Sequence, residues 1–226
     1  MSPQAYLDSL QRAADYVELK EGDVLLDAGC GTGLLLSCLS APLKAGGRYV
    51  GLDILWAGLE ALCEKACRQN LKNLVSTVQA DLSKTLPFAD RSFQCVAAHF
   101  SVYTLPNEQI RSQVYREFRR VLKPGGRLIV SNPTTSYDAR RIIRISLVNS
   151  AGKISALRGW LRKVLIYPLA LRFGLKHVER QLKSGKWHAC NPEKLAEVIR
   201  HAGFAVEHWE TVYAESGCLV VARKPD

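Results

Sequence analysis

The chain has 226 residues and a formal charge of +10 at pH 7, from 31 Lys and Arg against 21 Asp and Glu. This length fits one domain, and a hydrophobic content of 47% excludes a disordered chain. The excess charge is local, because residues 136–190 hold 12 basic and 2 acidic residues while the rest of the chain holds 19 of each. We therefore expect a single domain over residues 1–226, with a basic insertion at residues 136–190 acting as a lid.

Nothing in the sequence predicts export or a membrane span. The start lacks the basic and apolar regions of a secretory signal. The longest purely apolar stretch of the basic insertion, residues 164–171, is far shorter than the ~20 residues of a spanning helix. The seven cysteines are odd in number and scattered, which is typical of reduced thiols in a cytoplasmic protein. Cys63 and Cys67 share a helix face without further ligands, so no metal site is expected.

Strand and helix patterns alternate along the chain. Strands are expected at residues 24–27, 48–53, 74–79, 93–100, 127–131, 206–212 and 218–223. Helices are expected at residues 34–39, 55–69 and 109–122, ended by Pro42 in the first case and by Pro124-Gly125-Gly126 in the last. Asn191 is expected to cap a further helix that ends at Gly203. This order predicts an α/β protein with a Rossmann-like, doubly wound, mostly parallel seven-stranded sheet, a C-terminal antiparallel hairpin and a helical insertion after strand 5.

A glycine-rich loop follows the first expected strand. It consists of Asp27, Ala28, Gly29, Cys30, Gly31, Thr32 and Gly33. Glycines remove the Cβ atoms that would block a ligand from approaching the backbone. Asp53 ends the second strand, where a carboxylate can accept hydrogen bonds from a ribose diol. The alternative is a tight strand-to-helix turn without a ligand.

The ligand chemistry at this loop argues against a dinucleotide. Dinucleotide-binding loops have the spacing G-x-G-x-x-G and direct backbone amides at a pyrophosphate. Here the spacing is G-x-G-x-G, and Asp27 precedes the first glycine by two residues. A carboxylate repels a pyrophosphate and attracts an ammonium group. The loop therefore favours a ligand with a ribose and an ammonium group, as in S-adenosylmethionine.

Five segments in order extend this interpretation to most of the chain. They are VLLDAGCGTG, YVGLDI, ADLSKTLPFADRSFQCV, VLKPGGRLIVSNP and NPEKLAEVIRHAGFAVE. With them the chain resembles a class I S-adenosylmethionine-dependent methyltransferase, of the branch that includes quinone and small-molecule methyltransferases. The resemblance covers most of the chain outside residues 136–188.

The resemblance implies roles for single residues. Asp27, Gly29, Gly31 and Gly33 would line the methionine and ribose part of the cofactor, and Asp53 would bind the ribose hydroxyls. The adenine would meet three further residues. These are Ile54, which would pack on the ring, Asp81, which would accept from the amino group, and Leu82, whose backbone would contact the ring. Asp81 could instead cap the following loop.

Methyl transfer needs alignment more than covalent help, and a base only where the acceptor must lose a proton. His99, at the end of the fourth strand, is the leading candidate for a base and for a cofactor contact. A packed, hydrogen-bonded histidine is the alternative. Tyr103 is the next candidate as a substrate contact, although packing is its alternative role. Trp187 and His188 lie where the insertion rejoins the core, and they either close over a substrate or form a surface junction.

The basic insertion alternates apolar and basic residues. Residues 154–168 have helical apolar spacing, and further basic residues extend the charged region over residues 140–186. Three interpretations remain open: a lid with a solvated basic face, a surface for an anionic membrane, and an RNA-binding surface. Because the insertion is rich in Ile and Leu and poor in aromatic residues for stacking, RNA ranks below the membrane.

The sequence thus predicts a cytoplasmic S-adenosylmethionine-dependent methyltransferase that acts on a small or lipid-like apolar substrate. Its basic region allows binding to the inner face of a membrane. The alternatives are an RNA methyltransferase and a non-catalytic protein of the same fold that binds S-adenosylmethionine or RNA, since a fold does not determine an activity.

Overall fold

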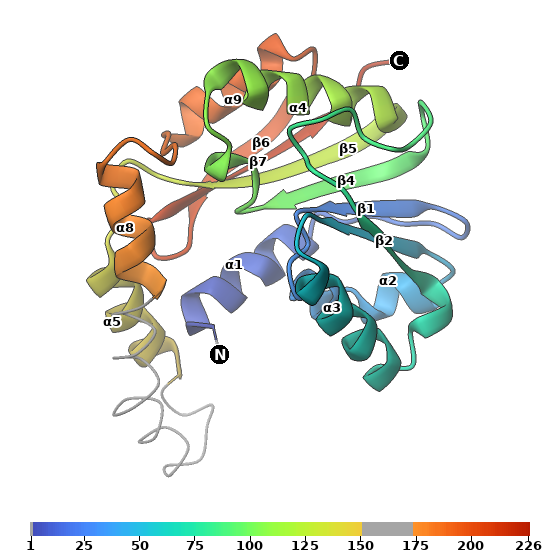
Figure 1. Ribbon diagram of the computed structural model, residues 1–226, viewed down its shortest axis with the longest axis horizontal. Helices are drawn as coiled ribbons and strands as arrows, with labels where there is room; N and C mark the ends of the chain where they lie inside the picture. The colour runs from blue at the N-terminus through green and yellow to red at the C-terminus, as the bar shows by residue number, and fades with distance from the viewer. Residues whose placement is uncertain (1, 151–173) are drawn as a thin grey trace.

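A computed structural model of the chain describes residues 2–150 and 174–226. Seven strands form one sheet in the order β3-β2-β1-β4-β5-β7-β6 (Figure 1). The strands are β1 (Val24–Ala28), β2 (Arg48–Asp53), β3 (Val75–Gln79), β4 (Phe93–His99), β5 (Leu122–Pro133), β6 (Ala205–Val212) and β7 (Gly217–Arg223). Strands β1 to β5 pair in parallel, and β7 runs antiparallel to both β5 and β6. The predicted mostly parallel sheet with a closing hairpin is confirmed.

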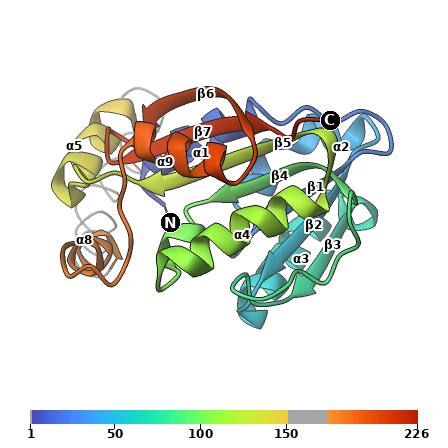
Figure 2. The ribbon, with the colours of Figure 1, turned by 90° about the horizontal axis from the view of Figure 1, so that it is seen from above.

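Helices cover both faces of the sheet (Figures 1 and 2). On one face lie α4 (Glu108–Val121) and α9 (Pro192–His201), and Phe118 and Leu195 bury their side chains there. On the other face lie α1 (Gln4–Ala14), α2 (Ser40–Lys44) and α3 (Trp56–Arg68), with Leu10 and Leu62 in the core. Because apolar side chains pack on both faces of the sheet, the ends of its strands are held in fixed positions.

The first helix, α1, has no counterpart in the sequence analysis. Its buried face consists of Ala5, Ser9, Leu10, Ala13 and Ala14. Four of these five side chains are small, so the face carries a weak apolar periodicity. Its position is fixed by segments far along the chain instead, among them the helix that follows β5.

Two proline-containing segments differ from the expectation. Residues 35–38 form a 3₁₀ helix, η1 (Leu35–Cys38), and Pro42 lies inside the first turn of α2. Proline is tolerated there because first-turn N–H groups have no partner within the helix. Pro124-Gly125-Gly126 lies within β5, which begins directly after α4. Gly125 has φ +68°, and the pairing of β4 with β5 shifts register at this point, so these residues form an irregularity in a strand.

The predicted cap of α9 is corrected as well. Asn191 occupies the N-cap position, and Pro192 is the first helical residue. The Asn191 side chain makes no capping bond, because its Oδ1 accepts a hydrogen bond from Thr135 Oγ1 at 2.6 Å. That bond ties the start of α9 to the loop after β5.

The basic insertion begins with α5 (Ala139–Ser150) and ends with α8 (Lys176–Lys183). It leaves the sheet after β5, so both helices stand at the carboxyl ends of the parallel strands (Figure 1), where open sheets bind their ligands. The helix expected at residues 154–168 lies outside the described residues. Among the helices that the structure describes, none combines the length and apolarity needed to cross a membrane.

Candidate active site

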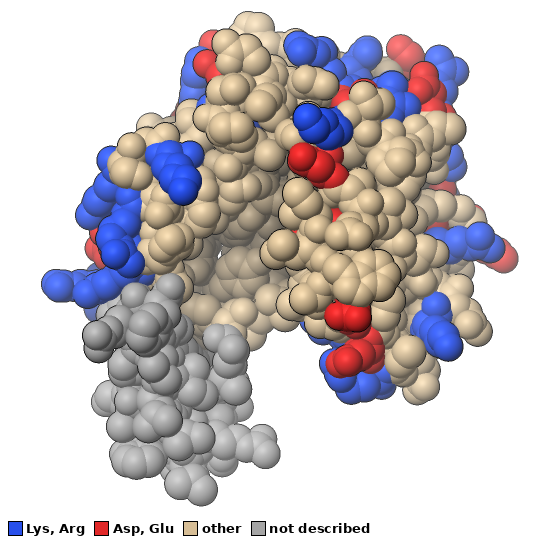
Figure 3. All heavy atoms as spheres, viewed as in Figure 1, with Lys and Arg blue, Asp and Glu red and all other residues tan. Residues whose placement is uncertain are grey.

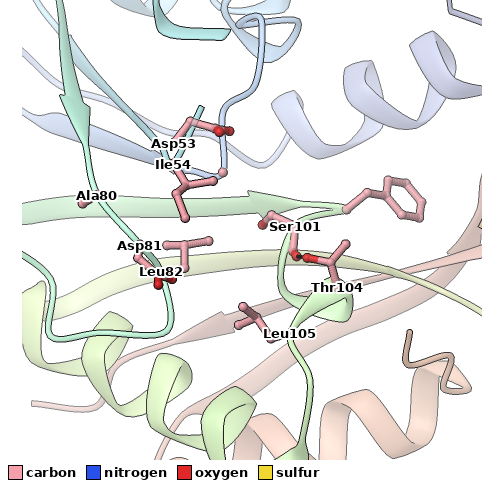
Figure 4. Close-up of a pocket in the computed structure, with 10 residues that line it drawn as sticks. Asp53, Ile54, Ala80, Asp81, Leu82, Ser101, Thr104 and Leu105 are labelled. Carbon is pink, nitrogen blue, oxygen red and sulfur yellow. Dashed lines mark hydrogen bonds between the residues drawn. The ribbon is translucent and has the colours of Figure 1, made fainter. Parts of the chain in front are cut away.

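Two adjoining cavities open at the carboxyl ends of β1, β2 and β4, each of about 290 Å³. They share Gly29 and Phe100, so together they form one elongated cleft, here called the cofactor cleft. Further residues lining the first cavity are Asp53, Ile54, Ala80, Asp81, Leu82, Ser101, Thr104 and Leu105 (Figure 4). Further residues lining the second are Tyr6, Leu10, Asp27, Cys30, Gly31, Thr32, Leu34, Leu35 and His99.

The glycine-rich loop lines the cleft through Gly29 and Gly31, whereas Gly33 is buried and lines neither cavity. Gly29 has φ +80°, and a Cβ there would lie 2.4 Å from the Cβ of Ser101. Gly33 has φ +66°, and its Cβ would lie 2.3 Å from Leu62 Cδ1. Neither position has room for a side chain. Ala28 is buried under the loop, and its carbonyl oxygen accepts a hydrogen bond from Ser101 Oγ at 2.7 Å.

Asp53 borders the first cavity from the end of β2 (Figure 4). Its Oδ2 accepts the Gly31 N–H at 2.8 Å, and its Oδ1 accepts the Leu55 N–H at 2.9 Å. These bonds orient the carboxylate at the cavity edge and join the glycine loop to the start of α3. Ile54, beside it, is 57% exposed and lines the same cavity.

Asp81 and Leu82 line the first cavity from the loop after β3 (Figure 4). The Oδ1 of Asp81 accepts the Ser83 N–H at 2.8 Å, and this bond holds the pKa of Asp81 below its usual range. Asp81 therefore caps the loop and lines the first cavity at the same time.

Asp27 places a buried carboxyl group in the second cavity. It is 3% exposed, and the Tyr49 hydroxyl donates a hydrogen bond to its Oδ2. Burial raises the pKa of Asp27 to about 7, although the Tyr49 bond acts in the opposite direction. A carboxyl group so poorly solvated gains from a cationic partner, which fits an ammonium group.

His99 lies at the end of β4 with both ring nitrogens bonded within the protein. Its Nδ1 is 2.9 Å from Ser131 Oγ, and its Nε2 is 3.2 Å from Ser9 Oγ of α1. Burial lowers the pKa of His99 to about 3, so the ring is neutral at physiological pH. The ring also packs edge-to-face on Tyr6, with centroids 5.4 Å apart.

Tyr103 and His188 come together next to the cleft. Tyr103 is 7% exposed, and burial raises its pKa to about 12. Its carbonyl oxygen accepts the His188 N–H at 2.9 Å, and its ring meets Trp187 edge-to-face at 5.4 Å. Trp187 and His188 line a third cavity of about 320 Å³, together with Thr134, Thr135, Tyr137, Glu179, Leu182, Lys183, Gly185 and Ala189. His99 and His188 therefore line different cavities.

Several residues of the cleft were missed from the sequence. Phe100 and Ser101 directly follow β4, so the rule that ligands bind at strand ends could have identified them. Tyr6 and Leu10 line the second cavity from α1, and no local sequence pattern predicts them as site residues. Tyr49 looks like an ordinary strand residue, and only the fold places its hydroxyl against Asp27.

Comparison with known proteins identifies the family. The methyltransferase domain family matches residues 26–130. A demethylmenaquinone methyltransferase of Lactobacillus johnsonii is 36% identical over 129 residues, which are 57% of this chain and 50% of that protein, so the match spans half of its length. A 2-phytyl-1,4-naphthoquinone methyltransferase of Thermosynechococcus vestitus is 30% identical over 203 residues, covering 88% of this chain and 80% of that protein. The chain belongs to the class I S-adenosylmethionine-dependent methyltransferases.

The solved structures agree with this family in fold. A SAM-dependent methyltransferase from Aquifex aeolicus superposes with a TM-score of 0.64 at 17% identity, covering 97% of this chain and 92% of that one. The two proteins therefore share a fold.

The residues of this methyltransferase fit S-adenosylmethionine. The cleft is long enough for two unlike halves, with Asp53 at the first cavity and the poorly solvated Asp27 at the second. Among the described residues, no cluster of three or more His, Cys, Asp and Glu is placed to hold a metal ion.

Proposed function

We propose that this methyltransferase moves a methyl group from S-adenosylmethionine to a small apolar acceptor, a quinone or an isoprenoid-like molecule, by direct in-line transfer. The observation that carries the proposal is the cofactor cleft, whose halves match a nucleoside and an amino acid. Support for the acceptor class comes from the Thermosynechococcus vestitus relative, whose name specifies a naphthoquinone. S-adenosylmethionine, when bound, supplies a methyl group on a sulfonium that leaves as a neutral thioether.

The side chains of the cleft have separate tasks in this proposal. Asp53 accepts hydrogen bonds from the ribose hydroxyls, and Asp27 pairs with the ammonium group. The adenine contacts Ile54, Asp81 and Leu82. Gly29 and Gly31 let the backbone approach, with Cys30 and Thr32 as small neighbours, and Gly33 lets the loop pack on Leu62. Holding the cofactor at several points fixes the methyl group in one direction, and proximity then supplies most of the rate gain.

The acceptor enters, in this proposal, through the third cavity. That cavity lies beside Tyr103, whose ring is 6.4 Å from that of Phe100, centroid to centroid, and Phe100 lines both halves of the cleft. Trp187 and Tyr137 offer faces for a flat apolar ring, and His188 and Thr134 offer hydrogen bonds at its edge.

Of the three candidate catalytic residues, His188 is the best placed to take a proton. His99 has both ring nitrogens engaged and a pKa lowered to about 3, so we assign it to positioning α1 against β5. Tyr103 keeps its proton because burial raises its pKa, and it serves as an aromatic wall. His188 lines the third cavity and is less buried than His99. It acts only where the acceptor must lose a proton.

An anionic membrane is the proposed partner of the basic region at residues 140–186, at the cytoplasmic face. In α5 and α8 the exposed basic residues are Arg140, Arg144, Lys176, Arg180 and Lys183. Each basic residue near such a surface contributes about 1 kcal/mol of attraction. An apolar acceptor dissolves in the same membrane, so a protein held there meets its substrate at high local concentration.

Calorimetric titration with S-adenosylmethionine tests the cofactor assignment. We expect wild type to bind and Asp53→Ala to lose on the order of 100-fold in affinity, because charge-assisted hydrogen bonds contribute roughly 1.5–3 kcal/mol each. Glu64→Ala, an exposed carboxylate on the neighbouring α3, is the matched control and should bind as wild type does. Equal affinity of wild type and Asp53→Ala would refute the assignment.

Transfer of a labelled methyl group tests the acceptor. Purified protein would be offered quinone, isoprenoid and RNA fractions, and we expect label in the quinone or isoprenoid fraction. Label confined to RNA would overturn the acceptor class while leaving the cofactor site intact. Cofactor binding without transfer to any fraction would favour the non-catalytic alternative.

A further inference from the structure

We propose that Leu55 and Trp56 form an apolar anchor that enters an anionic membrane and, with the basic helices α5 and α8, seats the mouth of the cofactor cleft on the membrane surface. The inference rests on the membrane partner proposed above and adds a second contact outside the basic region. It therefore assigns the orientation of the protein on the membrane.

The anchor is a run of large apolar side chains left in solvent. Ile54, Leu55 and Trp56 are consecutive, with exposed fractions of 57%, 66% and 57%. Ile54 lines the first cavity, so adenine accounts for its exposure. Neither Leu55 nor Trp56 lines the cofactor cleft, the third cavity or two further cavities of the described residues. Two adjacent large apolar side chains, one of them a tryptophan, suit the interface between lipid headgroups and acyl chains.

The backbone holds this anchor rigidly next to the cleft. The Leu55 N–H donates to Asp53 Oδ1, and the other oxygen of that carboxylate binds the Gly31 N–H. One helical turn later, Gly58 packs so closely on the Gly31 carbonyl oxygen that a Cβ would lie 2.9 Å from it. Leu59, at 1% exposure, fixes the first turn of α3 in the core. Leu55 and Trp56 therefore stay outward, and their depth in a membrane sets the depth of the cleft.

Positive charge lies on the opposite side, at α8, whose residues Leu182 and Lys183 line the third cavity. Figure 3 shows Lys and Arg side chains gathered over α8, beside a hollow whose other border is mostly uncharged. Glu179 pairs with Lys183 at 2.6 Å, and Arg141 pairs with Glu215 at 2.8 Å. The remaining exposed basic residues of these two helices are Arg140, Arg144, Lys176 and Arg180. Val148, 68% exposed, adds an apolar side chain to α5.

The two borders have complementary roles at one surface. The basic helices attract anionic headgroups over a distance of about a Debye length, and the anchor adds contact that salt does not screen. A membrane fits both contributions, because it presents charge outside and apolar chains beneath. Because α5 and α8 stand on one side of α1 and α3 stands on the other (Figure 1), an apolar acceptor moves from the bilayer to the protein without crossing water.

Co-sedimentation with vesicles tests the anchor. The full-length chain would be mixed with phosphatidylcholine vesicles with and without phosphatidylglycerol. We expect the double variant Leu55→Ser/Trp56→Ser to lose about tenfold or more in partitioning into anionic vesicles. Trp209→Ser is the matched control, because Trp209 is 42% exposed on the edge strand β6, and it should partition as wild type does.

Salt and fluorescence separate the anchor from simple charge attraction. Raising the salt concentration should weaken wild-type binding but leave a residual fraction that the double variant lacks. Brominated lipids should quench wild-type tryptophan fluorescence more than that of Trp56→Phe. Equal partitioning of wild type and the double variant, equal loss in Trp209→Ser, or no quenching difference for Trp56→Phe would overturn the anchor.

Two further measurements keep this inference distinct from the proposed function. The single variant Trp56→Ser, which leaves Leu55 and its bond to Asp53 in place, should transfer methyl groups to a short-chain, detergent-dispersed naphthoquinone as well as wild type does. Vesicle binding that depends on Leu55 and Trp56 without any methyl transfer by wild type would refute the function and leave the anchor standing. Binding of single-stranded RNA in place of vesicles, with the same dependence on these two residues, would overturn the choice of a membrane.

Discussion

The two halves of the cofactor cleft are built in different ways. In the first cavity, Asp53, Asp81 and Ser101 follow the ends of their own strands, and bonds such as Gly31 N–H to Asp53 span 22 residues. In the second cavity, part of the wall is α1, which is held by bonds of much longer range. Ser9 meets His99 across 90 residues, and the Ala5 N–H donates to Ser146 Oγ across 141. The first half is therefore a property of local strand ends, and the second depends on the completed fold.

A glycine pair tests the locally built half, with the largest expected effect. Gly29→Ala would place a Cβ 2.4 Å from Ser101 Cβ in a backbone with φ +80°. We expect cofactor binding to be lost by more than about 100-fold, since the clash displaces the loop shared by both cavities. Calorimetry with S-adenosylmethionine gives the affinity.

Gly22→Ala is the control for this prediction, because Gly22 has φ +81° and nothing within 4 Å of the added Cβ. It should cost roughly 1–2 kcal/mol of stability from the left-handed backbone alone and leave cofactor affinity unchanged. Similar affinities for the two variants would mean that backbone strain, and not close approach, explains the glycines.

The pH dependence of cofactor affinity tests the role of Asp27 in the second cavity. Burial raises the pKa of Asp27 to about 7, so below that pH the group holds a proton that an ammonium ligand must displace. Between about pH 6 and pH 7.5 we expect wild-type affinity to rise several-fold, with proton release visible as a buffer-dependent binding enthalpy. Asp27→Asn should bind more weakly and show a flat profile. A wild-type profile that is flat over this range would contradict the pairing of Asp27 with the cofactor.

His99 tests the long-range half through stability. Burial lowers its pKa to about 3 in the folded protein, against about 6.5 when unfolded. Between these values the unfolded chain binds one more proton, so the free energy of unfolding falls by up to about 1.4 kcal/mol per pH unit as the pH drops below about 6.5. Above that pH the contribution is complete.

Denaturant titrations of His99→Gln from about pH 4 to pH 7 measure this contribution. We expect the slope against pH to shrink by about one proton, and kcat/KM to keep the inflections of wild type. Loss of an inflection in kcat/KM would instead support His99 as the base. His201→Gln, an exposed histidine on α9, provides the control slope.

The smallest effect is expected at the contact of α1 with α5. Ser146→Ala removes the acceptor of the Ala5 N–H, and we expect a loss of about 1 kcal/mol in stability, concentrated as faster hydrogen exchange in α1. Ser92→Ala, an exposed hydroxyl far along the chain, serves as the control. Equal exchange of α1 in both variants would show that the contact does not hold the helix.

The same division explains how far the sequence could be interpreted. Apolar runs and turn residues predicted all seven strands, including the two of the C-terminal hairpin. For β5 the prediction covered only residues 127–131 and omitted the irregular start of the strand. Most of the residues predicted to bind the cofactor line the two cavities, because strand ends and glycines are local signals, whereas Ala28 and Gly33 are buried and line neither cavity. Helix α1 was missed since its buried face is mostly alanine and serine. Pairings such as Asp27 with Tyr49 depend on the register of β1 against β2, which no local pattern specifies.

Side chains with two available partners also escaped prediction. Asn191 was expected to cap α9, and the fold offered it the Thr135 hydroxyl instead. The candidate bases were chosen by residue type and place in the chain, whereas burial decides the protonation of His99 and Tyr103. His99 and His188 look equivalent as sequence, and the structure separates them by the atoms around each ring.

The docking of α1 has a consequence for the order of folding. Arg12 pairs with Glu210 at 2.7 Å, and Tyr6 packs on Tyr213 with ring centroids 5.6 Å apart. Helix α1 therefore cannot reach its final position until β6 and the residues after it have been synthesised. Contacts of such sequence separation form late, because the loop between them must first lose its freedom. A nascent chain can thus complete its glycine loop early and still lack a closed cofactor cleft until β6 has been synthesised.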